Sequence, residues 1–241
     1  ASYYASVDKE VTVFTFEVHR DFIDSFYEIA KGLLYTPAFD ENDFNRIKSN
    51  QQNYVDQIIK ASSDEEYSKM ALEDLLFRGT SYQHMIMGTS SGVDGITLDD
   101  AKEFYKKYFT KDNLLIGIAG NYDEEFKKKL LLDKEQLPAL QFTLPEAPEI
   151  SMPEGLQVEI IEKENALGSA MYAGYPLDIT RADDDFAALM VANSWLGEHR
   201  KSYGQLYEKI RRTRSMNYGD YTYIEWYENG GRVQLPLAHV P

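Results

Sequence analysis

The chain has 241 residues, 43% of them apolar and none of them cysteine, so it can bury a core but cannot form a disulfide or a thiolate zinc site. Its 40 acidic residues outnumber 25 basic ones and give a formal net charge of −15. A chain this acidic repels phosphate groups, which argues against nucleic acid and anionic membrane surfaces as partners. No apolar run approaches the roughly 20 residues that a membrane-spanning helix needs.

The first part of the chain predicts one strand followed mainly by helices. Residues 11–18 (VTVFTFEV) alternate in polarity and are rich in β-branched and aromatic side chains, which is typical of a strand. Apolar residues then recur at helical spacing in five segments, 21–35, 40–60, 65–77, 98–108 and 121–132. Between the last three of these, residues 88–95 predict a loop and residues 114–119 (LLIGIA) predict a buried strand.

Prolines divide the chain in two. Pro138, Pro145, Pro148 and Pro153 fall in a stretch without periodicity, so residues 138–153 predict an extended linker between residues 1–137 and residues 154–241. The second part predicts strands and helices in turn, with strands at 156–162, 169–175 and 218–227, helices at 183–196 and 203–214, and a turn at Gly230–Gly231. This mixture indicates an α+β fold with a largely antiparallel sheet covered by helices.

Common catalytic motifs are absent from the sequence. The four histidines, His19, His84, His199 and His239, are far apart, and neither H-E-x-x-H nor its inverse H-x-x-E-H occurs. A phosphate-binding glycine loop and a G-x-S-x-G motif are missing as well. We therefore assign no metal ligand and no catalytic residue to this chain.

Arg211 and Tyr218 are the best candidates for binding a substrate. Arg211 stands near the end of a predicted helix, and Tyr218 stands seven residues later at the start of a predicted strand. A guanidinium there can bind a peptide carbonyl or carboxylate with two hydrogen bonds, and a tyrosine hydroxyl can donate to a developing oxyanion. From spacing alone, a surface arginine and a core tyrosine are the better explanation.

At this segment the chain resembles the pitrilysin/insulinase family of zinc metallopeptidases. The family pattern I-R-E-x-R-G-L-A-Y is matched in register by Ile210, Arg211, Arg214, Met216 and Tyr218, with Ser215 where the family usually has Gly. Residues 34–40 (LYTPAFD) resemble the family turn L-x-N-P-x-F-D, and residues 113–121 (NLLIGIAGN) resemble its helix-then-strand signature. The resemblance therefore extends, in order, over nearly the whole chain.

The resemblance implies two insulinase-like (LuxS-like or processing-peptidase-like) units in tandem, both truncated. Residues 1–137 would be the C-terminal part of the first unit and residues 154–241 the N-terminal part of the second. The implied parent is a zinc endopeptidase or oligopeptidase that encloses a peptide or an unfolded protein between two halves. In such a parent Arg211 and Tyr218 would contact substrate, the remaining half would be the partner, and a bacterial periplasmic or extracytoplasmic location would be expected.

Two departures from the family pattern imply that this portion binds no zinc. H-x-x-E-H is not in the chain, and the helix that carries the family's third zinc ligand, a glutamate, reads Asn50-Gln51-Gln52-Asn53. Neutral amides cannot supply the anionic ligand of a His₂Glu site, and the nearest carboxylate, Asp56, is displaced. Zinc, if the parent is active, would be bound elsewhere in it.

Two alternatives stay open at this point. The same substitutions suit a non-catalytic structural or partner subunit of a processing-peptidase-like complex, paired with a homologous subunit. The remaining alternative is an unrelated α+β peptide-binding module.

Overall fold

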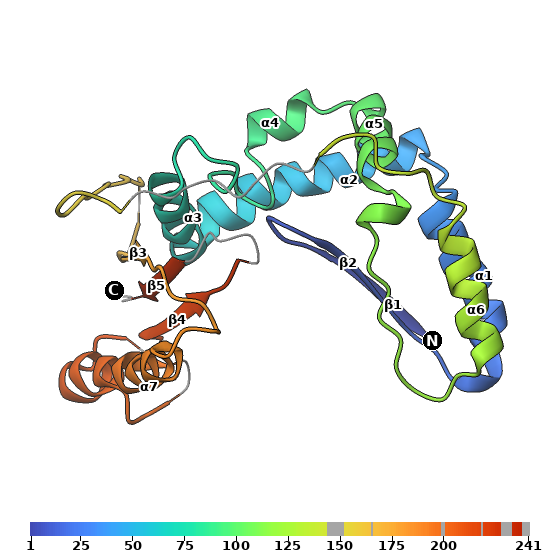
Figure 1. Cartoon of the computed structure of the whole chain (residues 1–241). Helices are drawn as coiled ribbons and strands as arrows, with labels where there is room; N and C mark the ends of the chain where they lie inside the picture. Colours follow the sequence, from blue (N-terminus) through green and yellow to red (C-terminus); the bar gives the residue numbers. More distant parts are fainter. Residues whose placement is uncertain (144–151, 165, 199–200, 218, 228–232, 238–241) are drawn as a thin grey trace. The chain divides into compact units, whose positions relative to one another are not determined.

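The computed structural model describes residues 1–143, 152–164, 166–198, 201–217, 219–227 and 233–237. The chain forms two compact units (Figure 1), one from residues 1–52 and 90–145 and the other from residues 53–89 and 146–241. Residues 53–89 thus group with the C-terminal part of the chain. The predicted domains at 1–137 and 154–241 concern the parent protein and stay a prediction.

The first unit begins with a β-hairpin. Strands β1 (Ser2–Val7) and β2 (Thr12–Glu17) pair antiparallel, from Ser2 opposite Glu17 to Val7 opposite Thr12. The Asp8 carboxylate closes the turn by accepting from the backbone N–H groups of Glu10 and Val11, each at 2.7 Å. The sequence predicted β2 but not β1 as a separate strand, because residues 2–7 (SYYASV) do not alternate in polarity.

Helices make up most of the remainder of the first unit. In chain order they are η1 (Arg20–Phe22), α1 (Ile23–Tyr35), α2 (Glu41–Asn53), α4 (Ser90–Gly95), α5 (Leu98–Tyr108), η3 (Lys111–Asn113) and α6 (Glu124–Lys134). Local signals set several of their starts. Thr97 and Asp100 form a reciprocal capping box at α5, and the Asp123 side chain accepts from the Phe126 N–H at the start of α6.

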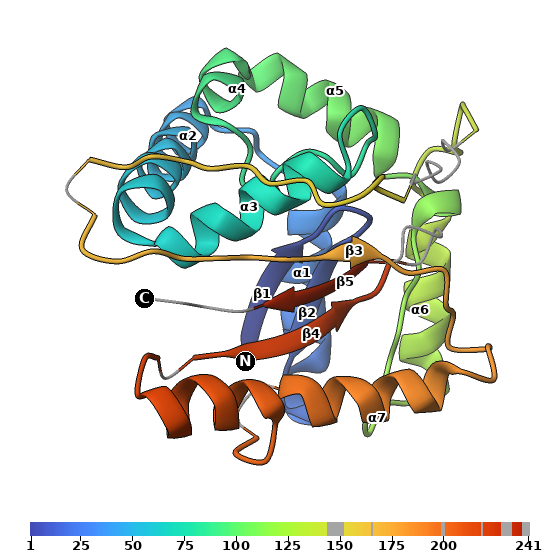
Figure 2. The same cartoon turned by 90° about the vertical axis from the view of Figure 1, so that its left-hand side faces the viewer.

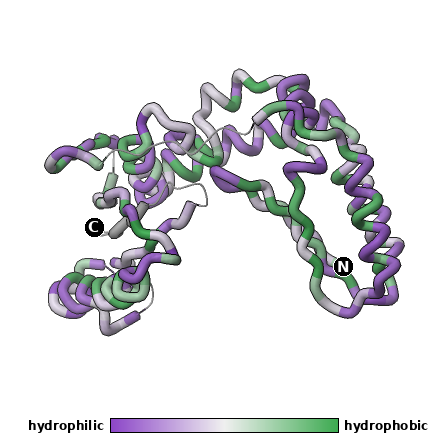
Figure 3. Tube along the Cα trace, viewed as in Figure 1, coloured by the Kyte–Doolittle hydropathy of each residue, from purple (hydrophilic) through white to green (hydrophobic). Residues whose placement is uncertain are grey.

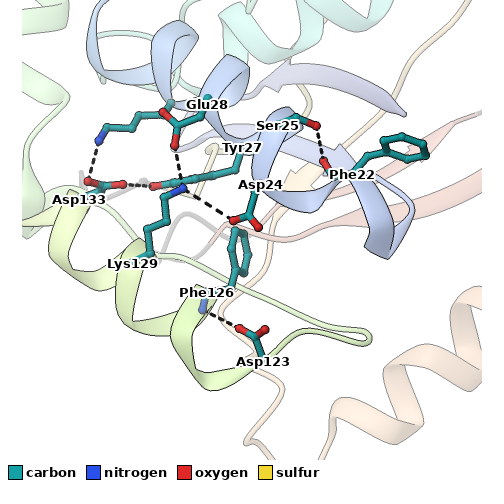
Figure 4. Close-up of polar contacts among 10 residues, drawn as sticks. Phe22, Asp24, Ser25, Tyr27, Glu28, Asp123, Phe126, Lys129 and Asp133 are labelled. Carbon is teal, nitrogen blue, oxygen red and sulfur yellow. Dashed lines mark hydrogen bonds and ion pairs between the residues drawn. The ribbon is translucent and has the colours of Figure 1, made fainter.

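Helices α1 and α6 pack side by side through a buried carboxylate. Hydrophilic and hydrophobic residues alternate along both helices (Figure 3). The Tyr27 ring packs edge-on against the Phe126 ring, with 5.4 Å between the two ring centroids. The Asp133 carboxylate, 6% exposed, accepts from the Tyr27 hydroxyl at 2.9 Å and from Lys31 Nζ at 2.7 Å (Figure 4). This contact fixes one helix against the other.

The second unit holds a three-stranded sheet with helices beside it. Its elements are η2 (Tyr54–Lys60), α3 (Asp64–Leu76), β3 (Tyr175–Pro176), α7 (Phe186–Gly197), η4 (Tyr207–Arg212), β4 (Tyr221–Glu225) and β5 (Val233–Leu237). The strand order is β3-β5-β4 with antiparallel pairing throughout, and α7 runs along β4 (Figure 2). The core of this unit centres on Phe77 and Tyr82, both nearly inaccessible to solvent. The predicted α+β class with antiparallel sheet is confirmed.

Three predicted strands are wrong in detail. Residues 114–119 and 156–162 are extended but unpaired, with Leu115 95% and Leu156 92% exposed, and of residues 169–175 only Tyr175 enters a strand. The apolar pattern of these segments is typical of strands, but a strand also needs a hydrogen-bonded neighbour, and the sheets among the described residues include neither 114–119 nor 156–162. The predicted turn at Gly230–Gly231 lies outside the described residues.

The predicted loop at residues 88–95 is also wrong, since residues 90–95 form helix α4. Its Val93 side chain is 3% exposed, so burial of one apolar side chain outweighs the weak helix propensity of the Ser and Gly residues around it. No helix among the described residues is both long enough and apolar enough to cross a membrane.

Candidate functional site

The amide-rich run that replaces the expected zinc ligand forms the last turn of α2. Its Gln52 side chain donates to Asp94 Oδ1 at 3.3 Å, and Lys48, one turn earlier, donates to the carbonyl oxygens of Asp94 and Ile96. The end of α2 is therefore held by contacts to the α4 region rather than directed at a metal. Beyond Asn53 the helix continues as the π-helical stretch η2.

The residues present do not fit a zinc ion. The carboxylate nearest the amide run, Asp56, is engaged by Lys60 Nζ at 3.2 Å. Across the part of the chain that the structure describes, no three His, Asp or Glu side chains gather closely enough to hold a metal. A peptidase zinc site needs at least three such ligands, so no chemical step is assigned to zinc in this chain.

Arg211 lies in η4, a π-helical stretch within a helical run over residues 205–214. Its guanidinium carbon is 4.9 Å from the centroid of the Tyr207 ring, a cation–π geometry that orients the side chain. π-Helical turns are uncommon and occur often at functional sites. The Tyr207 ring thus orients an arginine that is not fully buried, as binding a substrate would require.

Ser215 ends this helix in an unusual backbone conformation. Its φ is +54°, in the left-handed region that favours glycine. The Ser215 N–H donates to the Arg211 carbonyl at 2.9 Å, and the Met216 N–H donates to the Ile210 carbonyl at 3.3 Å. The bond from Ser215 to Arg211 is the one that defines an αL C-cap, in which the residue after the helix takes a left-handed conformation, and this explains why a glycine would suit position 215. Tyr218 itself lies outside the described residues.

A polar contact between α3 and β4 lies close in sequence to this segment. The Tyr221 hydroxyl donates to Glu65 Oε1 at 2.7 Å, and the Tyr172 hydroxyl donates to the same oxygen at 3.2 Å. Burial first, and then the hydrogen bond to Glu65, raise the pKa of Tyr221 to about 12. The tyrosine therefore stays protonated at neutral pH and remains a donor.

The other end of β4 is held to the same helix by an ion pair. Lys69 Nζ lies 2.7 Å from Glu225 Oε1 and 5.2 Å from the centroid of the Tyr223 ring. Burial alone lowers the pKa of Lys69, but hydrogen bonds to Glu225 and Tyr223 outweigh it and raise that pKa. Sequence reasoning missed this contact. Two features of the sequence could have suggested it. Glu65, Lys69 and Glu73 recur every four residues and so share one face of a helix. Residues 221, 223, 225 and 227 alternate and so share one face of a strand.

Comparison with protein families gives the decisive observation. Residues 95–233, more than half of the chain, match the family model described as "Peptidase M16 inactive domain". The chain belongs to this peptidase M16 family. The predicted membership of the pitrilysin/insulinase-type peptidases, in a non-catalytic portion, is thereby confirmed.

Individual relatives agree with this assignment to the M16 family. The "Uncharacterized zinc protease YmxG" of Bacillus subtilis (strain 168) is 23% identical over 235 residues, which cover 96% of this chain and 54% of that protein. The "Probable inactive metalloprotease YmfF" of the same strain is 25% identical over 198 residues, which cover 79% of this chain and 45% of that protein. The chain therefore spans about half the length of these curated relatives.

A solved structure carries the same fold. The peptidase M16 inactive domain from Pseudomonas fluorescens superposes with a TM-score of 0.80 at 18% identity, over 99% of this chain and 57% of that one. At this identity the likeness shows the fold alone, and it agrees with the predicted fold class.

Proposed function

We propose that this chain is the helper portion of a two-half M16 peptidase, which contributes chamber wall and a substrate-binding arginine but no zinc. In this proposal the domain bounds stay at 1–137 and 154–241. The observation that carries it is the combination of an amide-rich run at the end of α2 with an Arg211 segment that retains the family pattern. A portion that bound neither zinc nor substrate would not need the Arg211 segment.

The chemistry assigned to this portion is binding and not bond cleavage. The Arg211 guanidinium, held against the Tyr207 ring, can form two parallel hydrogen bonds to a peptide carboxylate or span a backbone carbonyl. Tyr218 would donate its hydroxyl to the oxyanion that forms when water attacks the peptide carbonyl. Zinc and the group that activates water would come from the remaining half of the parent protein or from a homologous subunit.

The substrate proposed is an extended peptide or an unfolded protein. The chain has an excess of 15 negative charges, which favours peptides with basic residues through long-range attraction. Support for a second half comes from the relatives, of which this chain spans about half.

Substitution in the full-length protein tests the proposal. Arg211→Ala together with Tyr218→Phe should lower kcat/KM for an unstructured peptide by about 100-fold, because two contacts to the substrate and transition state are removed. The matched control is Arg212→Ala, since Arg212 is the adjacent residue but pairs with Glu208 at 2.9 Å on the surface. Unchanged hydrolysis in the double variant, with the control also unchanged, would refute the assigned role.

A structural or partner subunit is the second candidate function. The relative named a probable inactive metalloprotease favours it, because that protein is similar over 79% of this chain. The two candidates differ in peptide affinity: a purely structural subunit should bind an unstructured peptide equally well with and without Arg211.

A further inference from the structure

The close approach of two glycines sets the position of the helix that carries Arg211. Gly204 is buried and begins this helix, since its carbonyl accepts from the Glu208 N–H at 3.0 Å. Gly197 is buried at the end of α7. A Cβ added at Gly204 would stand 2.9 Å from the Cα of Gly197, closer than real Cβ contacts come. The backbones therefore touch without an intervening side chain.

The α7 side of this contact cannot easily move away. The Thr222 hydroxyl of β4 donates to the Asn193 carbonyl of α7 at 3.2 Å, and the Thr222 side chain is 1% exposed. Glu198, which follows α7, forms a backbone bridge to Thr222 as well. Strand β4 is in turn bonded to Glu65 and Lys69 of α3, so α7 packs against a strand that is itself held in place.

The helix carrying Arg211 is the part that would move. In a Gly204→Ala variant the new Cβ would lie 2.9 Å from the Gly197 Cα, whereas ordinary contacts begin at 3.4 Å. Relieving this contact requires a displacement of about 0.5 Å at the start of the helix. The obstacle is backbone, which cannot rotate out of the way as the end of a side chain can. The shift is therefore transmitted along the helix to Arg211, two turns later.

We propose that Gly204 is a positioning residue for substrate binding, acting through the close contact with Gly197 that fixes the Arg211 helix. This inference rests on the proposed function, in which Arg211 contacts the peptide. Displacements well below 1 Å weaken oriented hydrogen bonds, and a misplacement of about 1 Å costs up to about 100-fold in catalysis. Gly204→Ala should therefore weaken peptide binding while leaving the fold intact.

The test is a double-mutant cycle in the full-length protein, with the Kd of a fluorescent unstructured peptide as the readout. Gly204→Ala should raise Kd about 3- to 10-fold when Arg211 is present and should have no effect in the Arg211→Ala background. The control is Gly168→Ala, because a Cβ there meets nothing within 4 Å. Thermal unfolding of each variant separates a shifted helix from loss of fold.

A graded variant covers the case in which Gly204→Ala does not fold. Gly197→Ala brings its Cβ to 2.8 Å from Leu206 Cδ1 and 3.1 Å from Leu206 Cβ, on the helix that carries Arg211. Because Cδ1 can rotate away and the Cβ contact is less tight than the backbone contact at Gly204, a smaller rise in Kd with the same dependence on Arg211 is expected. An equal rise in both backgrounds, or no rise at all, would overturn the positioning role alone. If Arg211→Ala itself leaves Kd unchanged, the proposed function fails, and this inference fails with it.

Discussion

Replacing Ser215 by glycine should stabilise the second unit. Ser215 holds φ at +54° as the left-handed residue that ends the Arg211 helix in an αL C-cap. In this conformation a residue with a Cβ destabilises the folded state by roughly 1–2 kcal/mol relative to glycine. The greater freedom of glycine in the unfolded chain lowers stability by about 0.4–1 kcal/mol and so offsets part of the gain. Ser215→Gly should therefore raise the free energy of unfolding by about 0.5–1 kcal/mol.

Urea unfolding followed by tryptophan fluorescence measures this change. Both tryptophans, Trp195 and Trp226, lie in the second unit, so their emission reports the unit that contains position 215. With an m-value of about 2 kcal/mol/M, the midpoint should rise by about 0.25–0.5 M without a change in m. Ser215→Ala is the control, since it removes the hydroxyl but keeps the Cβ. The reasoning is refuted if glycine gives no more stability than alanine.

Three further substitutions have expected outcomes. Thr97→Ala should lower the free energy of unfolding by about 1 kcal/mol in thermal or urea unfolding, because it breaks the capping box of α5. Asp133→Asn should destabilise the first unit by about 1.5–3 kcal/mol at pH 7, since Lys31 loses its charged partner. Burial alone raises the pKa of Asp133, but hydrogen bonds lower it overall, so this stability exists above the ordinary aspartate pKa and is lost as pH falls through the lowered value. The difference between Asp133→Asn and the unaltered protein should therefore begin to shrink in acid unfolding below about pH 4 and disappear only below the lowered pKa. Tyr221→Phe should cost about 1 kcal/mol in the second unit through the lost hydrogen bond to Glu65, measured by the same fluorescence assay.

Local signals in the sequence predicted the helices well. The Thr97 side chain accepts from the Asp100 N–H to start α5, and the Ser63 side chain accepts from the Glu66 N–H to start α3. Both signals act over three residues, so a single sequence contains all the information they need. The Arg211 helix and the centre of β4 were predicted from a different local signal, the continuous spacing of their apolar and aromatic residues.

Contacts between distant residues could not be predicted. Glu65 and Tyr221 are 156 positions apart, and nothing in either segment identifies the other as its partner. The close approach of Gly197 and Gly204 depends on how two helices pack, which a pair of glycines in one sequence does not reveal. The strands predicted at 114–119 and 156–162 were wrong because their residue pattern is local, whereas a strand forms only where a distant segment pairs with it.

The affinity of the full-length protein for an unstructured peptide tests the central claim most directly. If this portion binds substrate through Arg211, then Arg211→Ala should raise the peptide Kd at least about 10-fold, as expected for a lost charge-assisted hydrogen bond, and Arg212→Ala should not. Equal Kd values for the two variants and the unaltered protein would contradict a substrate-binding role and would favour a purely structural subunit.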